Sequence, residues 1–159
     1  MIVVADTSPI NYLVLIGQIN VLHTLFHEVT IPEAVLRELN EPDAPSEVRE
    51  WLSATPPWLI VRSVASMAGA FSELDEGERE ALSLAVEVSA DLVLIDDARG
   101  REAARRVGLN MTGTLGVLVR AADAELLDLD SAISRLRATT FHVSPKLLEE
   151  VLQRRRSKN

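Results

Sequence analysis

Four short segments rich in aliphatic residues most constrain what this chain can fold into. They are residues 2–5, 29–31, 59–64 and 92–95, and residues 110–112 form a weaker fifth candidate. The first (IVVA) and the fourth (LVLI) are apolar at every position, without the alternation of a half-exposed strand. Such runs predict strands that are covered on both faces, as in a parallel sheet.

Segments with the apolar spacing of helices separate these candidate strands. Helices are expected at residues 11–16 and 19–26, at 32–39, from Pro45 to Leu52, and at 76–88, 99–107, 115–122, 131–136 and 145–155. Alternation of strands and helices predicts an α/β fold, here a three-layer α/β/α domain with a mainly parallel sheet of about five strands. The domain is expected to span residues 1–153, with a surface loop at 67–72 and a basic C-terminal tail at 154–159.

Composition excludes several classes of protein. The 159 residues suit one domain, whose core needs no disulfide or structural metal. The absence of cysteine excludes a disulfide scaffold and any Cys-ligated zinc or iron–sulfur centre, and it fits a reducing compartment. A net charge of −8 argues against coating nucleic acid through bulk charge, but it leaves room for a local site that acts on nucleic acid.

Lysine is nearly absent, which excludes further classes. The two lysines are Lys146 and Lys158, and no Gly-Lys pair exists to form a phosphate-binding P-loop. Receiver domains and haloacid-dehalogenase-type phosphatases also need a lysine late in the sheet, where this chain has none. No export signal and no run of about 18 apolar residues is present, so a cytoplasmic protein is expected.

Carboxylates follow two of the predicted strands. Asp6 comes directly after the first strand, and Asp96 and Asp97 come directly after the LVLI strand. Ligands of open α/β sheets bind beyond the carboxyl ends of the strands. If these two strands are neighbours, the three carboxylates meet at one edge of the sheet.

Each acidic residue also has a purely structural interpretation. Ser8 could cap the first helix, and Asp6 could simply satisfy nearby amides. Asp96 or Asp97 could cap the helix at 99–107, and Asp75 with Glu78 resembles a capping box. However, one helix needs only one cap, whereas two adjacent aspartates end the LVLI strand.

Glu38 is a further candidate. It lies near the end of its helix, where a negative charge is unfavourable to the helix dipole. Its position at the edge of the apolar stripe fits a functional residue and a solvated surface glutamate equally well.

Several carboxylates in one place raise one another's pKa values unless a cation is present. Oxygen ligands without cysteine suit Mg²⁺ or Mn²⁺. Such a site can orient water and a phosphate oxygen for in-line attack, so the chemistry indicated is phosphodiester hydrolysis. No nucleophile elbow or Ser-His-Asp order offers a covalent alternative.

Five strings in a specific order resemble the PIN-domain ribonucleases over most of the chain. Within that family they are most similar to a poorly characterised bacterial and archaeal subfamily related to VapC-type toxins. The strings are DTSPIN at 6–11, VLREL at 35–39, LDEGEREAL at 74–82, LIDD at 94–97 and TGTLG at 112–116. The resemblance implies the PIN strand order.

The resemblance also implies roles for individual residues. The acidic quartet of catalytic metal ligands would be Asp6, Glu38, Glu78 and Asp97, with Asp96 as an accessory ligand of Mg²⁺ or Mn²⁺. Ser8 would support the site by hydrogen bonding, and Asn11 and Thr114 are further supporting candidates. Arg101 follows the double aspartate on its helix, and that position fits either a contact with an RNA phosphate near the metal or an ion pair with a site carboxylate. The sequence departs from many toxins in having Glu78 for an aspartate, and Ile95 for a threonine.

The function implied is a magnesium- or manganese-dependent endoribonuclease, with the toxin of a toxin–antitoxin pair as one form of it. Its partners would be an RNA substrate, an antitoxin protein and a second copy of the chain in a homodimer. Two alternatives stay open, a PIN-like module that binds RNA or protein without catalysis, and a metal-dependent phosphatase for small molecules. His23 and His27 are interpreted as surface histidines, because the zincin glutamate is missing between them.

Overall fold

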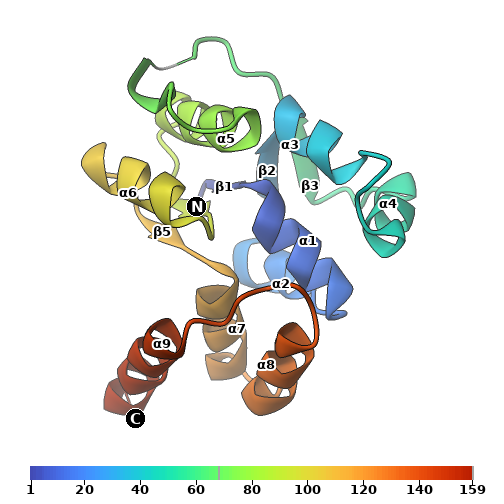
Figure 1. Ribbon diagram of the computed structural model, residues 1–159, viewed down its shortest axis with the longest axis vertical. Coiled ribbons are helices and arrows are strands. Elements are labelled where there is room, and N and C mark those ends of the chain that lie inside the picture. The colour runs from blue at the N-terminus through green and yellow to red at the C-terminus, as the bar shows by residue number, and fades with distance from the viewer. Residues whose placement is uncertain (68, 159) are drawn as a thin grey trace.

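The computed structural model describes residues 1–67 and 69–158, and its centre is a five-stranded parallel sheet (Figure 1). The strand order is β3-β2-β1-β4-β5, and every neighbouring pair is parallel. The strands are β1 (Val3–Ala5), β2 (Val29–Pro32), β3 (Leu59–Arg62), β4 (Leu92–Leu94) and β5 (Met111–Thr112). The predicted fold class and all five predicted strands are confirmed.

The helices lie where the apolar spacing predicts them, with shifted ends. They are α1 (Thr7–Leu15), α2 (Val21–Phe26), α3 (Glu33–Leu39), α4 (Ser46–Ser53), α5 (Glu76–Glu87), α6 (Ala98–Arg106), α7 (Thr114–Asp123), α8 (Leu129–Arg137) and α9 (Pro145–Lys158). The largest shift is at α1, which begins at Thr7 rather than at Asn11. Ser8 therefore lies inside a helix and does not cap it. Helix α9 continues through the basic segment from Arg154 to Lys158, and Asn159 lies outside the described residues.

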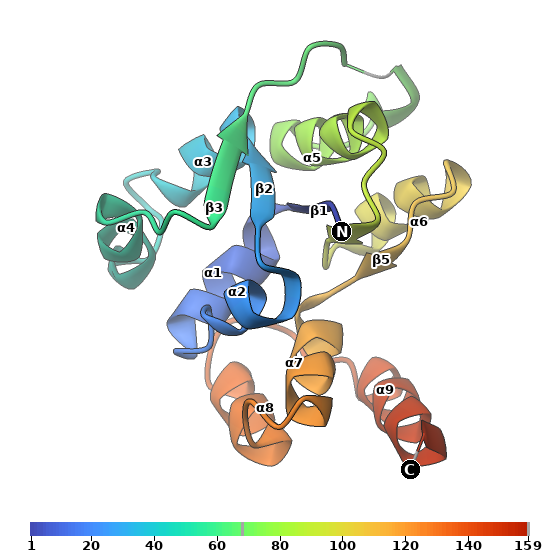
Figure 2. The same cartoon turned by 180° about the vertical axis from the view of Figure 1, so that it is seen from behind.

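Two apolar cores hold the three layers together, because successive strand residues point to opposite faces. Val3 and Ala5 belong to the larger core, which includes residues of α1, α2, α7 and α8. Val4 and Val93 belong to the smaller core, whose helical residues come from α5 and α6. Figures 1 and 2 show these two sets of helices on opposite sides of the sheet.

The segment expected to be a surface loop at 67–72 contributes to the smaller core instead. Residues Gly69–Phe71 form a short 3-10 helix, and the side chain of Phe71 is 1% exposed. Helices α5 and α6 present mostly small residues to this core, including Ala81, Ala85 and Ala103. A large aromatic side chain from the loop therefore fills space that these alanines leave. Ala68 lies outside the described residues.

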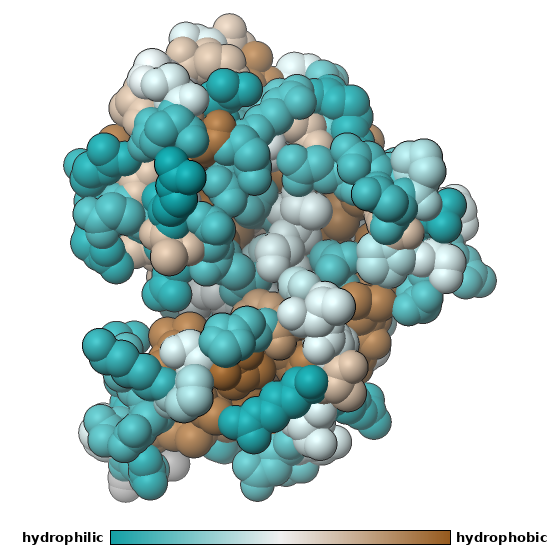
Figure 3. Space-filling view, viewed as in Figure 1, coloured by the Kyte–Doolittle hydropathy of each residue, from teal (hydrophilic) through white to brown (hydrophobic). Residues whose placement is uncertain are grey.

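The surface is mostly hydrophilic in Figure 3, and apolar patches on this face gather in the lower part, over α7, α8 and α9. Partly buried apolar residues of α9, among them Leu147, Leu148 and Val151, pack against the larger core. No helix in the described ranges 1–67 and 69–158 is long and apolar enough to span a membrane.

Replacing Phe71 tests its place in the smaller core. Phe71→Ala should lower the free energy of unfolding by about 3–5 kcal/mol, because it removes a large buried side chain and leaves a cavity. Met67→Ala is the matched control, since Met67 is 45% exposed in the same segment and should change stability little. Urea denaturation of both variants measures the difference. Equal stability of the two variants would contradict the core assignment.

Candidate active site

Adjacent strands β1 and β4 bring the two groups of aspartates together. Ala5 pairs with Leu94, and the Asp6 amide donates a hydrogen bond of 2.9 Å to the Leu94 carbonyl. The expectation that these two strands are adjacent in the sheet is therefore confirmed. The edge opens into a pocket of about 500 Å³, lined by Asp6, Thr7, Ser8, Asn11, Tyr12, Glu38, Asp75, Glu78, Asp96, Asp97, Phe141 and His142. The structure thus brings six carboxylates from four chain segments around one space.

Asp6 is the most deeply buried of these carboxylates, with 5% exposure. Burial raises its pKa to about 7, the neighbouring Thr7 amide offsets part of this shift, and the charges of Glu38, Asp75 and Asp96 add to it. Asp6 stands at the N-cap position of α1, but its side chain forms no capping hydrogen bond. The Asp6 side chain therefore does not cap α1, although it contacts the amide of Thr7.

Glu78 lies in the first turn of α5 and experiences the same crowding. Its pKa is raised to about 8 by burial first, and then by the negative charges of Asp75, Asp97, Asp6 and Glu38. Ionisation of Glu78 is therefore unfavourable in the absence of a cation. The predicted capping box is confirmed on its Asp75 side, because the Glu78 amide donates to Asp75 Oδ1 at 2.9 Å.

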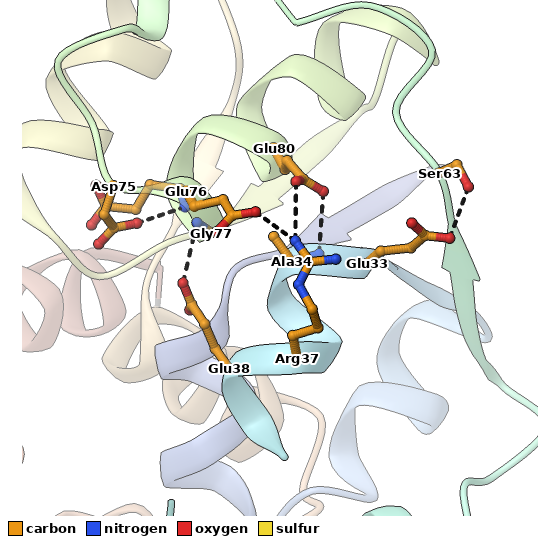
Figure 4. Close-up of polar contacts among 10 residues, drawn as sticks. Glu33, Ala34, Arg37, Glu38, Ser63, Asp75, Glu76, Gly77 and Glu80 are labelled. Atoms are coloured by element: carbon orange, nitrogen blue, oxygen red, sulfur yellow. Dashed lines mark hydrogen bonds and ion pairs between the residues drawn. The ribbon is translucent and has the colours of Figure 1, made fainter. Parts of the chain in front are cut away.

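Glu38 points from α3 toward the N-terminus of α5 (Figure 4). Its carboxylate accepts hydrogen bonds from the Thr7 hydroxyl and, at 3.1 Å, from the Gly77 amide. Burial is the main cause of a raised pKa at Glu38, and these two hydrogen bonds oppose it. The alternative of a freely solvated surface glutamate is therefore wrong.

Polar contacts between α3 and α5 fix the approach of Glu38. Arg37 pairs with Glu76 at 2.5 Å, and the Ala34 amide donates to Glu80 at 3.2 Å (Figure 4). Gly77 is needed at the point of contact, because a Cβ there would lie under 3.0 Å from both carboxylate oxygens of Glu38. Close packing against Glu38 thus explains why a glycine stands at position 77 in the LDEGE string.

Asp96 and Asp97 are adjacent but have different surroundings. Asp96 accepts three hydrogen bonds, from the Ser8 hydroxyl at 2.8 Å and from the Thr114 amide and hydroxyl at 2.7 Å each. Because a carboxylate offers about four acceptor sites, little of Asp96 remains free for a ligand. Two of the predicted supporting residues, Ser8 and Thr114, therefore act on the site through Asp96.

Asp97 caps α6, as one of the structural interpretations predicts. Its Oδ1 atom accepts hydrogen bonds from the Arg99 and Gly100 amides at 2.9 and 3.2 Å. The side chain is exposed and lines the acidic pocket, so a capping role does not remove it from the site. In the described part of the chain, Asp97 Oδ2 accepts no hydrogen bond and is available to a ligand.

The remaining candidate residues agree with expectation only in part. Asn11 lines the pocket, whereas Arg101 lies in a second pocket beside α7. Five further residues line the pocket without having been predicted from the sequence: Thr7, Tyr12, Asp75, Phe141 and His142. Thr7 could have been found from its place beside Asp6. Phe141 could not, because it comes from a remote loop and meets Tyr12 only in the folded chain, where the two ring centroids lie 5.0 Å apart in an edge-to-face contact. His23 and His27 are exposed, as expected.

The donor set fits a divalent cation in its chemistry. Carboxylate oxygens from Asp6, Glu38, Glu78 and Asp97 face one pocket, and oxygen is the ligand that Mg²⁺ and Mn²⁺ prefer. Across residues 1–67 and 69–158, no three acidic or histidine side chains are arranged to hold one ion together. Mg²⁺ commonly uses one or two carboxylates and keeps several waters, so it does not require such a trio.

The raised pKa values predict how stability depends on pH without metal. Between about pH 4 and pH 8 the folded chain binds more protons than the unfolded chain, because Asp6 and Glu78 have pKa values of about 7 and 8 against ordinary values of 3.8 and 4.5. The free energy of unfolding should therefore fall as pH rises through this interval. Melting temperatures in EDTA across the interval measure this slope.

Asp6→Asn should flatten the decline, because the amide does not titrate. Asp43→Asn, in the exposed loop after α3, is the control and should leave the slope as in the wild type. A wild-type melting temperature that rises with pH would contradict the assignment.

Comparisons with known proteins identify the family and the fold of the chain. The family model described as DUF3368: PIN domain matches residues 2–157. Among solved structures, the chain is similar to a PilT N-terminus domain protein from the hyperthermophilic archaeon Sulfolobus solfataricus P2. The TM-score is 0.54 at 15% sequence identity, and the match covers 91% of this chain and 100% of that chain. At this identity the likeness concerns the fold alone. No curated protein matches the chain. Because the family match extends over nearly all of its residues, the chain belongs to the PIN domain family.

Proposed function

We propose that this chain is a metal-dependent ribonuclease that hydrolyses phosphodiester bonds in RNA. The observation that carries the proposal is the gathering of six carboxylates around one pocket at the carboxyl edge of the sheet. Crowding and burial raise the pKa values of Asp6, Glu38 and Glu78, so the ionised site requires a compensating cation. PIN domains are typically metal-dependent nucleases, which supports the same conclusion.

The proposed metal ligands are Asp6, Glu38, Glu78 and Asp97. A bound Mg²⁺ or Mn²⁺ ion would supply a water of lowered pKa and neutralise charge on the phosphate. Glu38 is oriented by Thr7 and Gly77, and Asp96 links α1 to α7 through Ser8 and Thr114. These hydrogen bonds hold the pocket walls in place, so Asp96 is a positioning residue in this proposal.

The two alternatives differ in what they predict for the acidic pocket. A module without catalysis has no use for a buried, uncompensated Asp6, so the intact acidic set favours an enzyme. A small-molecule phosphatase uses the same metal chemistry and is separated from a ribonuclease only by substrate. The toxin form of the proposal, with an antitoxin and a homodimer, rests on the family resemblance.

Cleavage of a labelled RNA in Mg²⁺, Mn²⁺ or EDTA tests the proposal. The wild type should cut RNA only with a metal ion, and Asp6→Asn should lower the rate about a hundredfold or more, because it removes a charge that neutral asparagine cannot replace. Asp43→Asn, outside the pocket, should cut like the wild type. Equal cutting by wild type and Asp6→Asn, or cutting in EDTA, would contradict the proposal. Metal-dependent hydrolysis of p-nitrophenyl phosphate without RNA cleavage would favour the phosphatase.

Gly77→Ala tests the positioning of Glu38 without changing any charge. The new Cβ must displace the carboxylate of Glu38, so the cleavage rate should fall about tenfold or more, as for other residues that orient metal ligands. Gly69→Ala is the matched control, because nothing lies within 4 Å of a Cβ at that position. Circular dichroism and melting temperature show whether each variant is folded. Full activity of folded Gly77→Ala would contradict the role of Glu38.

A further inference from the structure

A second pocket lies beside the acidic one and has the opposite charge. It has a volume of about 210 Å³ and lies among α6, β5, α7 and α9. Its charged lining residues are Arg101, Arg120, Asp123, Arg154 and Arg155. We refer to this site as the basic pocket. Four arginines against one aspartate are a local excess of positive charge on a chain whose net charge is −8.

Most of this positive charge has no internal partner. Arg155 pairs with Asp123 at 2.9 Å, but Arg101, Arg120 and Arg154 form no ion pair with any residue in the described part of the chain. The Nε atom of Arg101 is buried and, within the same residues, has no hydrogen-bond acceptor. Because Arg101 also lines the basic pocket, an anion from outside the chain can pair with its guanidinium charge.

One short segment separates the basic pocket from the acidic pocket. Thr112 and Gly113 line the basic pocket, and the amide of the next residue, Thr114, donates to Asp96 on the acidic side. Arg101 also lies one helical turn beyond Asp97 on α6. A single extended ligand that occupies the acidic pocket can therefore continue into the basic pocket.

We propose that the basic pocket binds a backbone phosphate of the same RNA strand whose scissile phosphate lies in the acidic pocket. This inference rests on the proposed function. Arginine guanidinium groups match the geometry of phosphate oxygens and can donate two parallel hydrogen bonds to them. Position favours RNA over an acidic protein segment, because the pocket adjoins the site where the strand would be cut.

Binding of a labelled single-stranded RNA in EDTA tests this proposal without any need for cleavage. The double variant Arg120→Gln/Arg154→Gln should bind about tenfold more weakly or worse, because two charged hydrogen-bond donors to phosphate are lost. The slope of log affinity against log salt concentration should become shallower by about 0.7 for each lost phosphate contact. Arg120 and Arg154 are exposed, so the fold should remain intact.

Arg156→Gln is the matched control, because Arg156 lies on the same helix but does not line the pocket. It should bind RNA like the wild type, with the same salt dependence. Asp123→Asn should strengthen binding, because it releases Arg155 from its ion pair, whereas Asp130→Asn on α8 should not. The single variants Arg120→Gln and Arg154→Gln are measured beside Arg156→Gln. If Arg156→Gln weakens RNA binding as much as either single variant, the effect is one of general charge and the proposal is overturned.

Two further outcomes would also overturn it. Unchanged RNA binding by the double variant, together with arginine-dependent binding of an oligoglutamate peptide, would assign the pocket to an acidic protein partner. Unchanged RNA binding, together with an arginine-dependent melting shift caused by inorganic phosphate, would assign it to a small phosphate ligand.

Failure of the proposed function has a different signature. In that case the double variant binds RNA weakly in EDTA, as expected here, but the wild type cuts no RNA with any metal. Conversely, if the wild type cuts RNA and the double variant binds RNA normally, the assignment of phosphate binding to the basic pocket is wrong and the proposed function stands.

Discussion

The parallel pairing of β1 with β4 is the interaction on which the rest of this structure depends. It joins residues about ninety positions apart, through the pairs Val3–Leu92, Val4–Val93 and Ala5–Leu94. Because both strands are short and apolar on both faces, they are stable only between two layers of helices. The same pairing sets Asp6 beside the end of β4, where Asp96 and Asp97 begin. Core and site are thus consequences of one register, and a shift of that register would disrupt both.

The acidic pocket contains two kinds of carboxylate. Asp96 and Glu38 accept hydrogen bonds from Ser8, Thr114, Thr7 and Gly77, and their positions are thereby fixed. Asp6 and Glu78 are crowded by charge and burial, and their pKa values rise to about 7 and 8. A site that only capped helices would have no need of the second kind. Their unfavourable ionisation is what a divalent cation would relieve. Glu38 has both properties, since its position is fixed by hydrogen bonds and burial also raises its pKa.

Local sequence patterns made most of the secondary structure and several of the site residues predictable. An unbroken apolar run such as LVLI predicts a buried strand wherever it lies, and the capping of α5 by Asp75 depends on a spacing of three residues. The role of Phe71 could not be predicted in this way, because it depends on the alanines that α5 and α6 present to it. Tyr12 and Phe141 likewise meet only through tertiary packing. Asp97 was ambiguous for another reason. From the sequence, capping α6 and facing the pocket are alternatives, whereas in the structure one side chain does both.

Segregation of charge follows from the same architecture. The acidic residues of the pocket come from the ends of β1 and β4 and from α3 and α5, whereas the basic pocket takes its arginines from α6, α7 and α9. The chain has fourteen arginines among its sixteen basic residues, and the planar guanidinium of arginine suits paired hydrogen bonds to phosphate oxygens. Neighbouring pockets of opposite sign suit a ligand that brings its own phosphates, because one pocket then holds the cation and the other holds the strand. Helix α9 packs on α7 and carries two of these arginines, so in our proposal it contributes to RNA binding as well as to the fold.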